Sequence, residues 1–197
     1  MQTYLVAFAV ALAVTYFSTP LVKDMAIRAG ALDAPDARKV HKRPIPRMGG
    51  LAIYFGFVVA VFASMHISYE IAGILLGGTA ILLLGIVDDV KQLSAKVKLF
   101  GQIAAAFVLV LFDVRIEWLT NPFGEMIYVD YFSVPLTILW VVSLTNTVNL
   151  IDGLDGLAAG VSTIASVTIL LVALQQNFWT VAILTAAVAG AGVGFLQ

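Results

Sequence analysis

Seven apolar runs, separated by short polar segments, constrain this sequence more than any other feature. They cover residues 4–22, 49–65, 71–87, 99–112, 134–151, 157–174 and 179–196. A bilayer core about 30 Å thick takes roughly 17–25 apolar residues per helix. Hydrophobic residues make up 61% of the chain and charged residues only 12%, which is too little charge for a water-soluble surface. We therefore expect an all-α, polytopic membrane protein with about seven transmembrane helices, in a single transmembrane domain over residues 1–197.

The positions of the positive charges predict the orientation. Of the 11 Lys and Arg residues, seven lie within 23–47 and three within 91–98. Because cytoplasmic loops are rich in Lys and Arg, we expect both segments on the cytoplasmic side and the N-terminus outside. Alternation then places 149–156 in the cytoplasm and 113–132 outside, where the pattern at 126–129 suggests a small hairpin. The basic residues follow the first run rather than precede it, which favours a retained span over a signal peptide.

Two adjacent carboxylates, Asp88 and Asp89, end the third apolar run. Neighbouring carboxylates repel each other unless a cation is present, and Mg²⁺ prefers carboxylates together with phosphates. The alternative is a solvated helix end, although the C-terminus of a helix is an unfavourable place for two anions. The pair is therefore a candidate site for a metal ion or for a phosphate bridged by one.

A second polar group follows the fifth run, with a polar side chain at every third position. Its members are Asn146, Asn149, Asp152 and Asp155. On a helix these residues would form one stripe, and Gly153 and Gly156 allow either a helix break or the close approach of a ligand. The alternative is a packing seam, because Asn side chains do pair between membrane helices. Acids inside or beside a membrane more often mark function, so a ligand site is favoured.

Two basic segments complete the set. The loop at 38–50 holds five Lys and Arg residues and His41 around the sequence PIPRMGG, and Lys91, Lys96 and Lys98 follow the acid pair. Both segments could simply determine topology or anchor lipid headgroups. However, Arg and Lys also bind phosphate groups, and a glycine pair lets backbone N–H groups approach an anion.

All of these groups are expected at the cytoplasmic surface, which favours metal-assisted phosphoryl transfer between a lipid phosphate and a cytosolic donor. The chain has no cysteine, which excludes thiolate nucleophiles and cysteine metal sites. An ion-coupled transporter is the alternative from another class, but it would place the acids near the middle of a span. A non-catalytic membrane subunit is a third reading.

The same segments resemble the polyprenyl-phosphate N-acetylhexosamine-1-phosphate transferases. The matching stretches are APDARKVH at 34–41, PIPRMGG at 44–50, GIVDD at 85–89, LSAKVK at 93–98 and NTVNLIDGLDG at 146–156. Members of that family join a sugar 1-phosphate from a UDP-sugar to undecaprenyl phosphate and release UMP. The RKVH and PIPRMGG version is similar to the branch that uses UDP-N-acetylglucosamine in teichoic acid or O-antigen initiation. The branch that uses UDP-muramoyl-pentapeptide usually shows a TPTMGG form and is kept as the alternative.

The resemblance implies a role for each candidate residue. The implied catalytic residues are Asp88, Asp89 and Asp155, with Asp88 as the base or orienting group for the attacking phosphate. The implied substrate-binding residues are Lys42, Arg47, Lys98, Asn149 and Asp152. The implied ligands of Mg²⁺, or alternatively Mn²⁺, are Asp88, Asp152 and Asp155. The implied partners are undecaprenyl phosphate, UDP-N-acetylglucosamine and the lipid bilayer, with no nucleic acid and with a homodimer left open.

The resemblance also implies a bacterial cell membrane location, with several spans and an active site that faces the cytoplasm. Family members continue to about ten helices, and their later segments supply a further aspartate and a histidine-rich loop. The 197 residues stop before either feature. We therefore expect an N-terminal portion of an enzyme, incomplete at its C-terminus and inactive alone.

Overall fold

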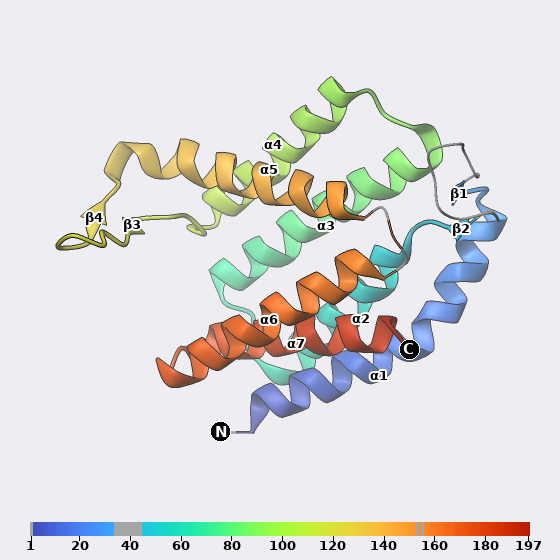
Figure 1. Cartoon of the computed structure of the whole chain (residues 1–197), viewed down its shortest axis with the longest axis horizontal. Coiled ribbons are helices and arrows are strands. Elements are labelled where there is room, and N and C mark those ends of the chain that lie inside the picture. The colour runs from blue at the N-terminus through green and yellow to red at the C-terminus, as the bar shows by residue number, and fades with distance from the viewer. Residues whose placement is uncertain (1, 34–44, 153, 155) are drawn as a thin grey trace. The chain divides into compact units, whose positions relative to one another are not determined.

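The computed structural model describes residues 2–33, 45–152, 154 and 156–197. Seven α-helices, a 3-10 helix and four two-residue strands occur in these ranges (Figure 1). In chain order they are α1 (Thr3–Arg28), β1 (Leu32–Asp33), β2 (Ile45–Pro46), α2 (Gly49–Ser64), α3 (Tyr69–Lys91), α4 (Ala95–Leu111), β3 (Trp118–Leu119), β4 (Ile127–Tyr128), η1 (Asp130–Phe132), α5 (Ser133–Ile151), α6 (Leu157–Gln175) and α7 (Trp179–Phe195). Each predicted apolar run is therefore helical.

Four of these helices are long and apolar enough to cross a membrane: α1, α3, the segment Asp130–Ile151 that contains α5, and α6. Two shorter helices, α2 and α7, are also apolar. Many of their large apolar side chains are exposed, for example Phe17 at 72% and Ile164 at 70%. Such surfaces suit lipid as a solvent. The prediction of a helical membrane protein is confirmed in this form, whereas the number of spans and the side of the N-terminus stay predictions.

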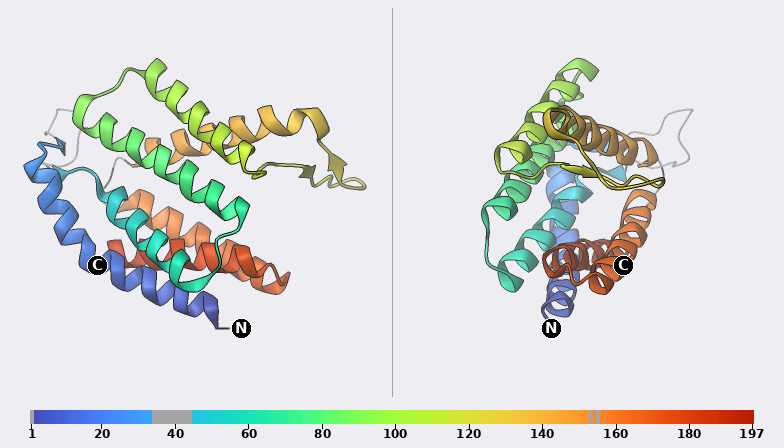
Figure 2. Two further views of the ribbon diagram at one scale, coloured as in Figure 1. Left: turned by 180° about the vertical axis from the view of Figure 1, so that it is seen from behind. Right: turned by 90° about the vertical axis from the view of Figure 1, so that its left-hand side faces the viewer.

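The chain divides into two compact units, each described here by itself. The first comprises Met1–His66, Asp89–Lys91 and Leu150–Gln197, and the second Ile67–Asp88 and Gln92–Asn149. In the first unit, α1 packs against α2 and α7, α2 also packs against α7, and α6 packs against α7 (Figure 2). The prediction of a single domain stays a prediction.

Small residues let the backbones of the first unit approach closely. A Cβ atom at Gly190 or Gly194 would overlap the α1 backbone at Phe8 or Leu12, and a Cβ atom at Gly192 would overlap Thr163 of α6. The two faces of α7 thus use alternate glycines, because residues two apart point to opposite sides of a helix. Small residues at four-residue spacing are a common way for membrane helices to associate.

The α1–α2 contact has a polar component inside an apolar surface. The Thr15 hydroxyl donates to the Ala52 carbonyl of α2 at 3.4 Å. A Cβ atom at Gly56 would overlap the same hydroxyl group. The Ser18 and Thr19 hydroxyls donate to the Thr15 carbonyl at 3.2 and 2.7 Å, near the proline inside α1. These three hydroxyl groups of α1 are therefore hydrogen-bonded, as a buried polar group requires.

In the second unit, α3 and α4 are joined near one pair of ends by aromatic contacts. The Tyr69 ring stacks on Phe112 with centroids 4.6 Å apart, and its hydroxyl donates to the Leu111 carbonyl at 2.8 Å. Gly73 leaves room for Phe112, because a Cβ atom there would overlap that side chain. Further along, Leu84 of α3 lies against Gly101 of α4. The two helices are therefore packed from their first contact near Tyr69 to the turn that joins them.

The segment between α4 and α5 contains the predicted hairpin. Strands β3 and β4 pair antiparallel, with Trp118 opposite Tyr128 and Leu119 opposite Ile127. The Trp118 and Tyr128 rings lie 4.9 Å apart, a favourable cross-strand aromatic pair. The hairpin expected from the alternation at 126–129 is confirmed.

Candidate active site

The end of α3 presents Asp88 in a fixed position. Helix α3 ends at Lys91, and Gln92 follows with a positive φ of 51° and donates its N–H to the Asp88 carbonyl at 2.8 Å. This left-handed residue reverses the chain, so that α4 begins only three residues later, at Ala95. The turn therefore brings the first residues of α4 beside the last turn of α3.

Both oxygens of the Asp88 carboxylate are held within this turn. Oδ1 accepts the Leu93 N–H at 3.0 Å, and Oδ2 accepts the Lys98 ammonium at 2.6 Å. The side chains of Lys98 and Asp88 are 24% and 23% exposed, so the pair is half-buried at the surface of the unit. A charge-assisted bond of this length is among the stronger hydrogen bonds in proteins. The predicted phosphate-binding lysine and the predicted catalytic aspartate are thus in direct contact.

Asp89 follows Asp88 directly and is partly buried. The boundary between the two compact units runs between these two residues. Their adjacency is fixed by the chain itself, so the pair expected from the sequence is present at the end of α3.

The polar stripe on α5 is only partly helical. Asn146 and Asn149 lie on α5, which ends at Ile151, and Asp152 follows the helix in a turn. Gly156, with a φ of 73°, precedes α6. Asp152 therefore does not continue a helical stripe with Asn146 and Asn149, because the helix ends first. The helix break that the glycines allow is present, and the close approach of a ligand stays a prediction.

The members of this stripe have different surroundings. Asn149 is exposed, whereas Asn146 is partly buried and paired with Gln102 of α4. Desolvation by the surrounding protein raises the pKa of the Asp152 carboxyl above its ordinary value, although the residue as a whole is exposed. An anion that is partly desolvated in this way is stabilised by a nearby cation.

Arg47 lies in the first unit, between β2 and α2. Its backbone N–H donates to the Ala31 carbonyl at 2.9 Å, which continues the antiparallel pairing of β1 with β2. Arg47 and Lys23 line a cavity of about 150 Å³, whose other lining residues are Thr19, Val22, Pro46, Gly49, Ala52 and Phe195. Lys23 and Arg47 are the charged residues among these eight, and most of the others are apolar.

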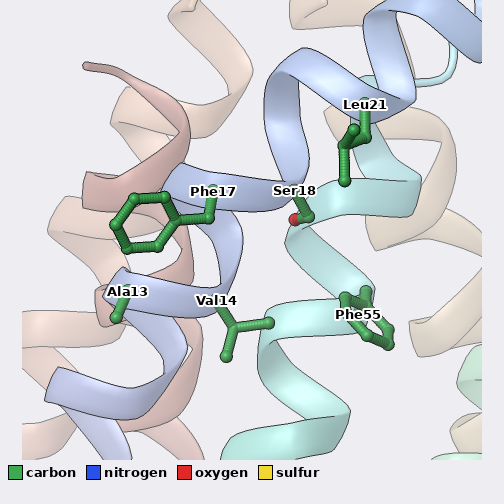
Figure 3. A pocket seen from close by; sticks show the side chains of 6 residues that line it. All are labelled: Ala13, Val14, Phe17, Ser18, Leu21 and Phe55. Atoms are coloured by element: carbon green, nitrogen blue, oxygen red, sulfur yellow. The ribbon is translucent and has the colours of Figure 1, made fainter.

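A larger hollow of about 330 Å³ lies on the α1–α2 pair and has a different character (Figure 3). It is lined by Ala13, Val14, Phe17, Ser18, Leu21 and Phe55. None of these six side chains is charged, and the Ser18 hydroxyl is bonded to the Thr15 carbonyl. The hollow therefore offers nothing to bind a phosphate, and the candidate site does not include it.

Among the predicted site residues that it describes, the structure brings Asp88 and Lys98 into direct contact. Asp88, Lys98 and Asn149 belong to the second unit, and Arg47, Asp89 and Asp152 to the first. Lys42 and Asp155 lie outside the described residues. Among the residues that the structure describes, no three His, Asp or Glu side chains form a group that could hold a metal ion. The binding of one metal ion by Asp88, Asp152 and Asp155 stays a prediction.

Sequence reasoning missed Gln102. This residue is 2% exposed and is one of the largest fully buried side chains of the described chain. The signal was an amide inside an apolar run, one helical turn after Lys98. Such a residue needs a partner when it is buried, and the sequence alone does not say which partner it has.

Comparisons with known proteins relate the whole chain to one family. The model of "Glycosyl transferase family 4" matches residues 71–197. A Bacillus subtilis (strain 168) protein named "Probable undecaprenyl-phosphate N-acetylglucosaminyl 1-phosphate transferase" is 43% identical over 100% of this chain and 55% of its own length. A Mycolicibacterium smegmatis decaprenyl-phosphate N-acetylglucosaminephosphotransferase is 38% identical over 93% of this chain and 50% of its own length.

A phospho-N-acetylmuramoyl-pentapeptide-transferase from Halalkalibacterium halodurans is 30% identical over 100% of this chain and 65% of its own length. The chain thus spans about half to two thirds of the curated relatives it matches. Both the family model and the full coverage by a relative at 43% identity lead to the same assignment. The chain belongs to glycosyl transferase family 4.

Proposed function

We propose that this chain belongs to an enzyme that transfers N-acetylglucosamine 1-phosphate from UDP-N-acetylglucosamine to undecaprenyl phosphate. The observation that carries the proposal is the half-buried contact of Asp88 with Lys98 at 2.6 Å, in the turn between α3 and α4. The relatives named for N-acetylglucosamine that cover at least 93% of this chain are 43% and 38% identical. Two muramoyl-pentapeptide relatives are 30% identical over the whole chain and 35% identical over 67% of it. This order supports the N-acetylglucosamine donor.

In this reaction an oxygen of the lipid phosphate attacks the sugar-bearing phosphorus of the donor. The bond from that phosphorus to the oxygen of UMP breaks, and UMP leaves. Asp88 would orient the attacking phosphate, or take its proton, with a carboxylate whose plane is fixed by Leu93 and Lys98. Lys98 would offset the negative charge of the approaching phosphate. Fixed charges of this kind act mainly by positioning and by electrostatic stabilisation.

Arg47, Asn149 and Asp152 would bind the donor. Arg47 and Lys23 line the same cavity, and their positive charges would offset the negative charge of a phosphate. The exposed Asn149 offers both a donor and an acceptor to a nucleotide or a sugar. The acids lie at the end of α3 and beyond the end of α5 rather than at mid-helix. This placement favours chemistry at the membrane surface over an ion path through the membrane.

We include Mg²⁺ in the proposal. Its ligands would be Asp88, Asp152 and Asp155, because carboxylate oxygens are hard donors that suit this ion. The raised pKa of Asp152 fits a carboxyl that gains from a nearby cation. When bound, the metal would neutralise charge on the pyrophosphate.

The orientation is tested by single cysteines in this cysteine-free chain. Ser94 is exposed in the α3–α4 turn, and Phe123 is 96% exposed in the β3–β4 turn. With any cysteine outside these 197 residues replaced, a membrane-impermeant maleimide should label Phe123→Cys on intact cells. Ser94→Cys should react only after the cells are permeabilised. Labelling of Ser94→Cys on intact cells would place the candidate active site on the outer surface and contradict the proposal.

The donor is tested in membranes that contain the full-length gene product, with undecaprenyl phosphate and Mg²⁺. Radiolabelled UDP-N-acetylglucosamine should yield a butanol-extractable sugar lipid and UMP, at a rate at least roughly tenfold above that with UDP-muramoyl-pentapeptide. Membranes without the protein are the control. Labelled lipid from the muramoyl donor alone would move the chain to that branch of the family.

A further inference from the structure

Helix α4 carries two polar contacts on one face, to different neighbours. Lys98 bonds to Asp88 of α3, and Gln102, four residues later, bonds to Asn146 of α5. Residues four apart lie on the same side of a helix. One face of α4 therefore connects the predicted catalytic acid with the helix that carries the predicted donor-binding amide.

The Gln102–Asn146 contact is reciprocal. Gln102 Nε2 donates to Asn146 Oδ1 at 3.3 Å, and Asn146 Nδ2 donates to Gln102 Oε1 at 2.8 Å. Asn146 Nδ2 also donates to the Val142 carbonyl of its own helix at 2.9 Å. Two hydrogen bonds between the same two amides fix both the position of α5 along its axis and its rotation about that axis, relative to α4. Because Gln102 is 2% exposed, water cannot readily replace a lost partner.

Rotation of α5 determines where its exposed polar residue points. Asn149 lies three residues after Asn146 on the same helix, so the two share a face. A change in the rotation of α5 would move Asn149 relative to Lys98 and Asp88, all within the second unit. The contact between α3 and α4 at Asp88 would not change, because it does not involve α5.

We propose that Gln102 is a positioning residue for the donor: through Asn146 it fixes the rotation of α5 and thereby the place of Asn149. This inference rests on the proposed function. It assigns the pair a role in recognising the nucleotide-sugar, and no role in binding the lipid phosphate. Breaking the Gln102–Asn146 pair should therefore change KM for the nucleotide-sugar and leave KM for the lipid phosphate unchanged.

The test measures KM for each substrate in membranes that contain the full-length gene product. Gln102→Leu should raise KM for UDP-N-acetylglucosamine and lower kcat, together by about 10- to 100-fold in kcat/KM, since small misplacements in a site have effects of this size. KM for undecaprenyl phosphate should stay within about twofold, because the Asp88–Lys98 contact is intact. The double variant Gln102→Asn with Asn146→Gln keeps two amides of the same total length. Its KM for UDP-N-acetylglucosamine should therefore lie closer to that of the unmodified protein than the KM of Gln102→Leu does.

A matched control is Thr145→Val on the same helix. The Thr145 hydroxyl donates to the Val141 carbonyl of its own helix at 2.8 Å, so its loss should leave both KM values unchanged. If Gln102→Leu reduces activity with neither KM altered, the pair only supports folding and the proposal is overturned. Unchanged kinetics would overturn it too. If Gln102→Leu does not reach the membrane, the double variant Gln102→Asn with Asn146→Gln is the remaining test. Its KM for UDP-N-acetylglucosamine should be close to that of the unmodified protein, and a KM that is not would overturn the proposal.

Failure of the proposed function has a separate signature. In that case the unmodified protein would form no labelled lipid from UDP-N-acetylglucosamine. A positioning role is judged only against an unmodified protein that turns over this donor, so the two failures are distinguished by the first measurement of the series.

Discussion

The Asp88→Asn variant is expected to lose about 10²- to 10³-fold in the rate of sugar-phosphate transfer, the usual effect of removing one preorganised charged group. Asparagine has nearly the same shape as aspartate and keeps one oxygen that can accept a hydrogen bond. It cannot both accept from Leu93 and pair with the Lys98 ammonium through two anionic oxygens, as Asp88 does. The variant therefore lacks the base or orienting carboxylate and leaves the lysine charge without its counterion.

The measurement is the formation of labelled lipid by membranes with equal amounts of the full-length gene product. A matched control is Asp113→Asn, because Asp113 also faces a cation, Arg115, at 3.6 Å. The Asp113 side chain is 65% exposed, and exposed ion pairs contribute little, so this variant should keep its rate. If Asp88→Asn retains the rate within about threefold while the membranes hold normal amounts of protein, Asp88 is not part of the chemistry proposed here.

The largest effect on stability is expected from Gly190→Ala. A Cβ atom at Gly190 would overlap the backbone of α1 at Phe8, and backbone atoms cannot move aside as a flexible side chain can. The two helices must separate, so that contacts along their whole interface weaken. Overpacking of this kind costs about 1–3 kcal/mol. The midpoint of thermal unfolding in detergent should fall by roughly 5 °C, as expected for a chain of this size.

Gly160→Ala is the matched control for this prediction. It makes the same chemical change in α6, at a position where a Cβ atom would meet nothing within 4 Å. Alanine is also the better helix former, by about 1 kcal/mol, so its unfolding midpoint should be unchanged or higher. Equal midpoints for the two variants would show that α1 and α7 are not in close contact in the folded protein.

The helices could be predicted from the sequence, but their ends could not. Apolar runs located all seven helices, because lipid and burial both require apolar side chains. The runs were ended at charged residues, whereas α1 continues through Lys23 and Asp24 to Arg28, and α4 begins before Lys96. A charge stops a helix from lying in hydrocarbon, but it does not interrupt the backbone hydrogen bonds that define the helix. The length of an apolar run therefore indicates how much of a helix can lie in the hydrocarbon core, and not where the helix begins and ends.

The same distinction holds for the candidate site. Asp88 and Lys98 could be placed close together from the sequence, since both lie in the short polar segment 88–98 between two apolar runs. The Gln102–Asn146 pair joins residues 44 apart, and their meeting depends on how two helices are rotated about their axes. No local pattern reports that rotation. Short connections therefore reveal contacts that the chain enforces, and packing between distant helices requires the structure.

The close contact of α7 with α1 has a consequence for how the protein is made. Phe8 and Leu12 leave the ribosome well before Gly190 and Gly194, which are their partners. Throughout the synthesis of the intervening segments, the face of α1 that α7 will cover must be held by lipid, by α2 or by the insertion machinery. The first unit is therefore completed late in biogenesis, whereas the α3–α4 turn that holds Asp88 can form as soon as its own two helices have entered the bilayer.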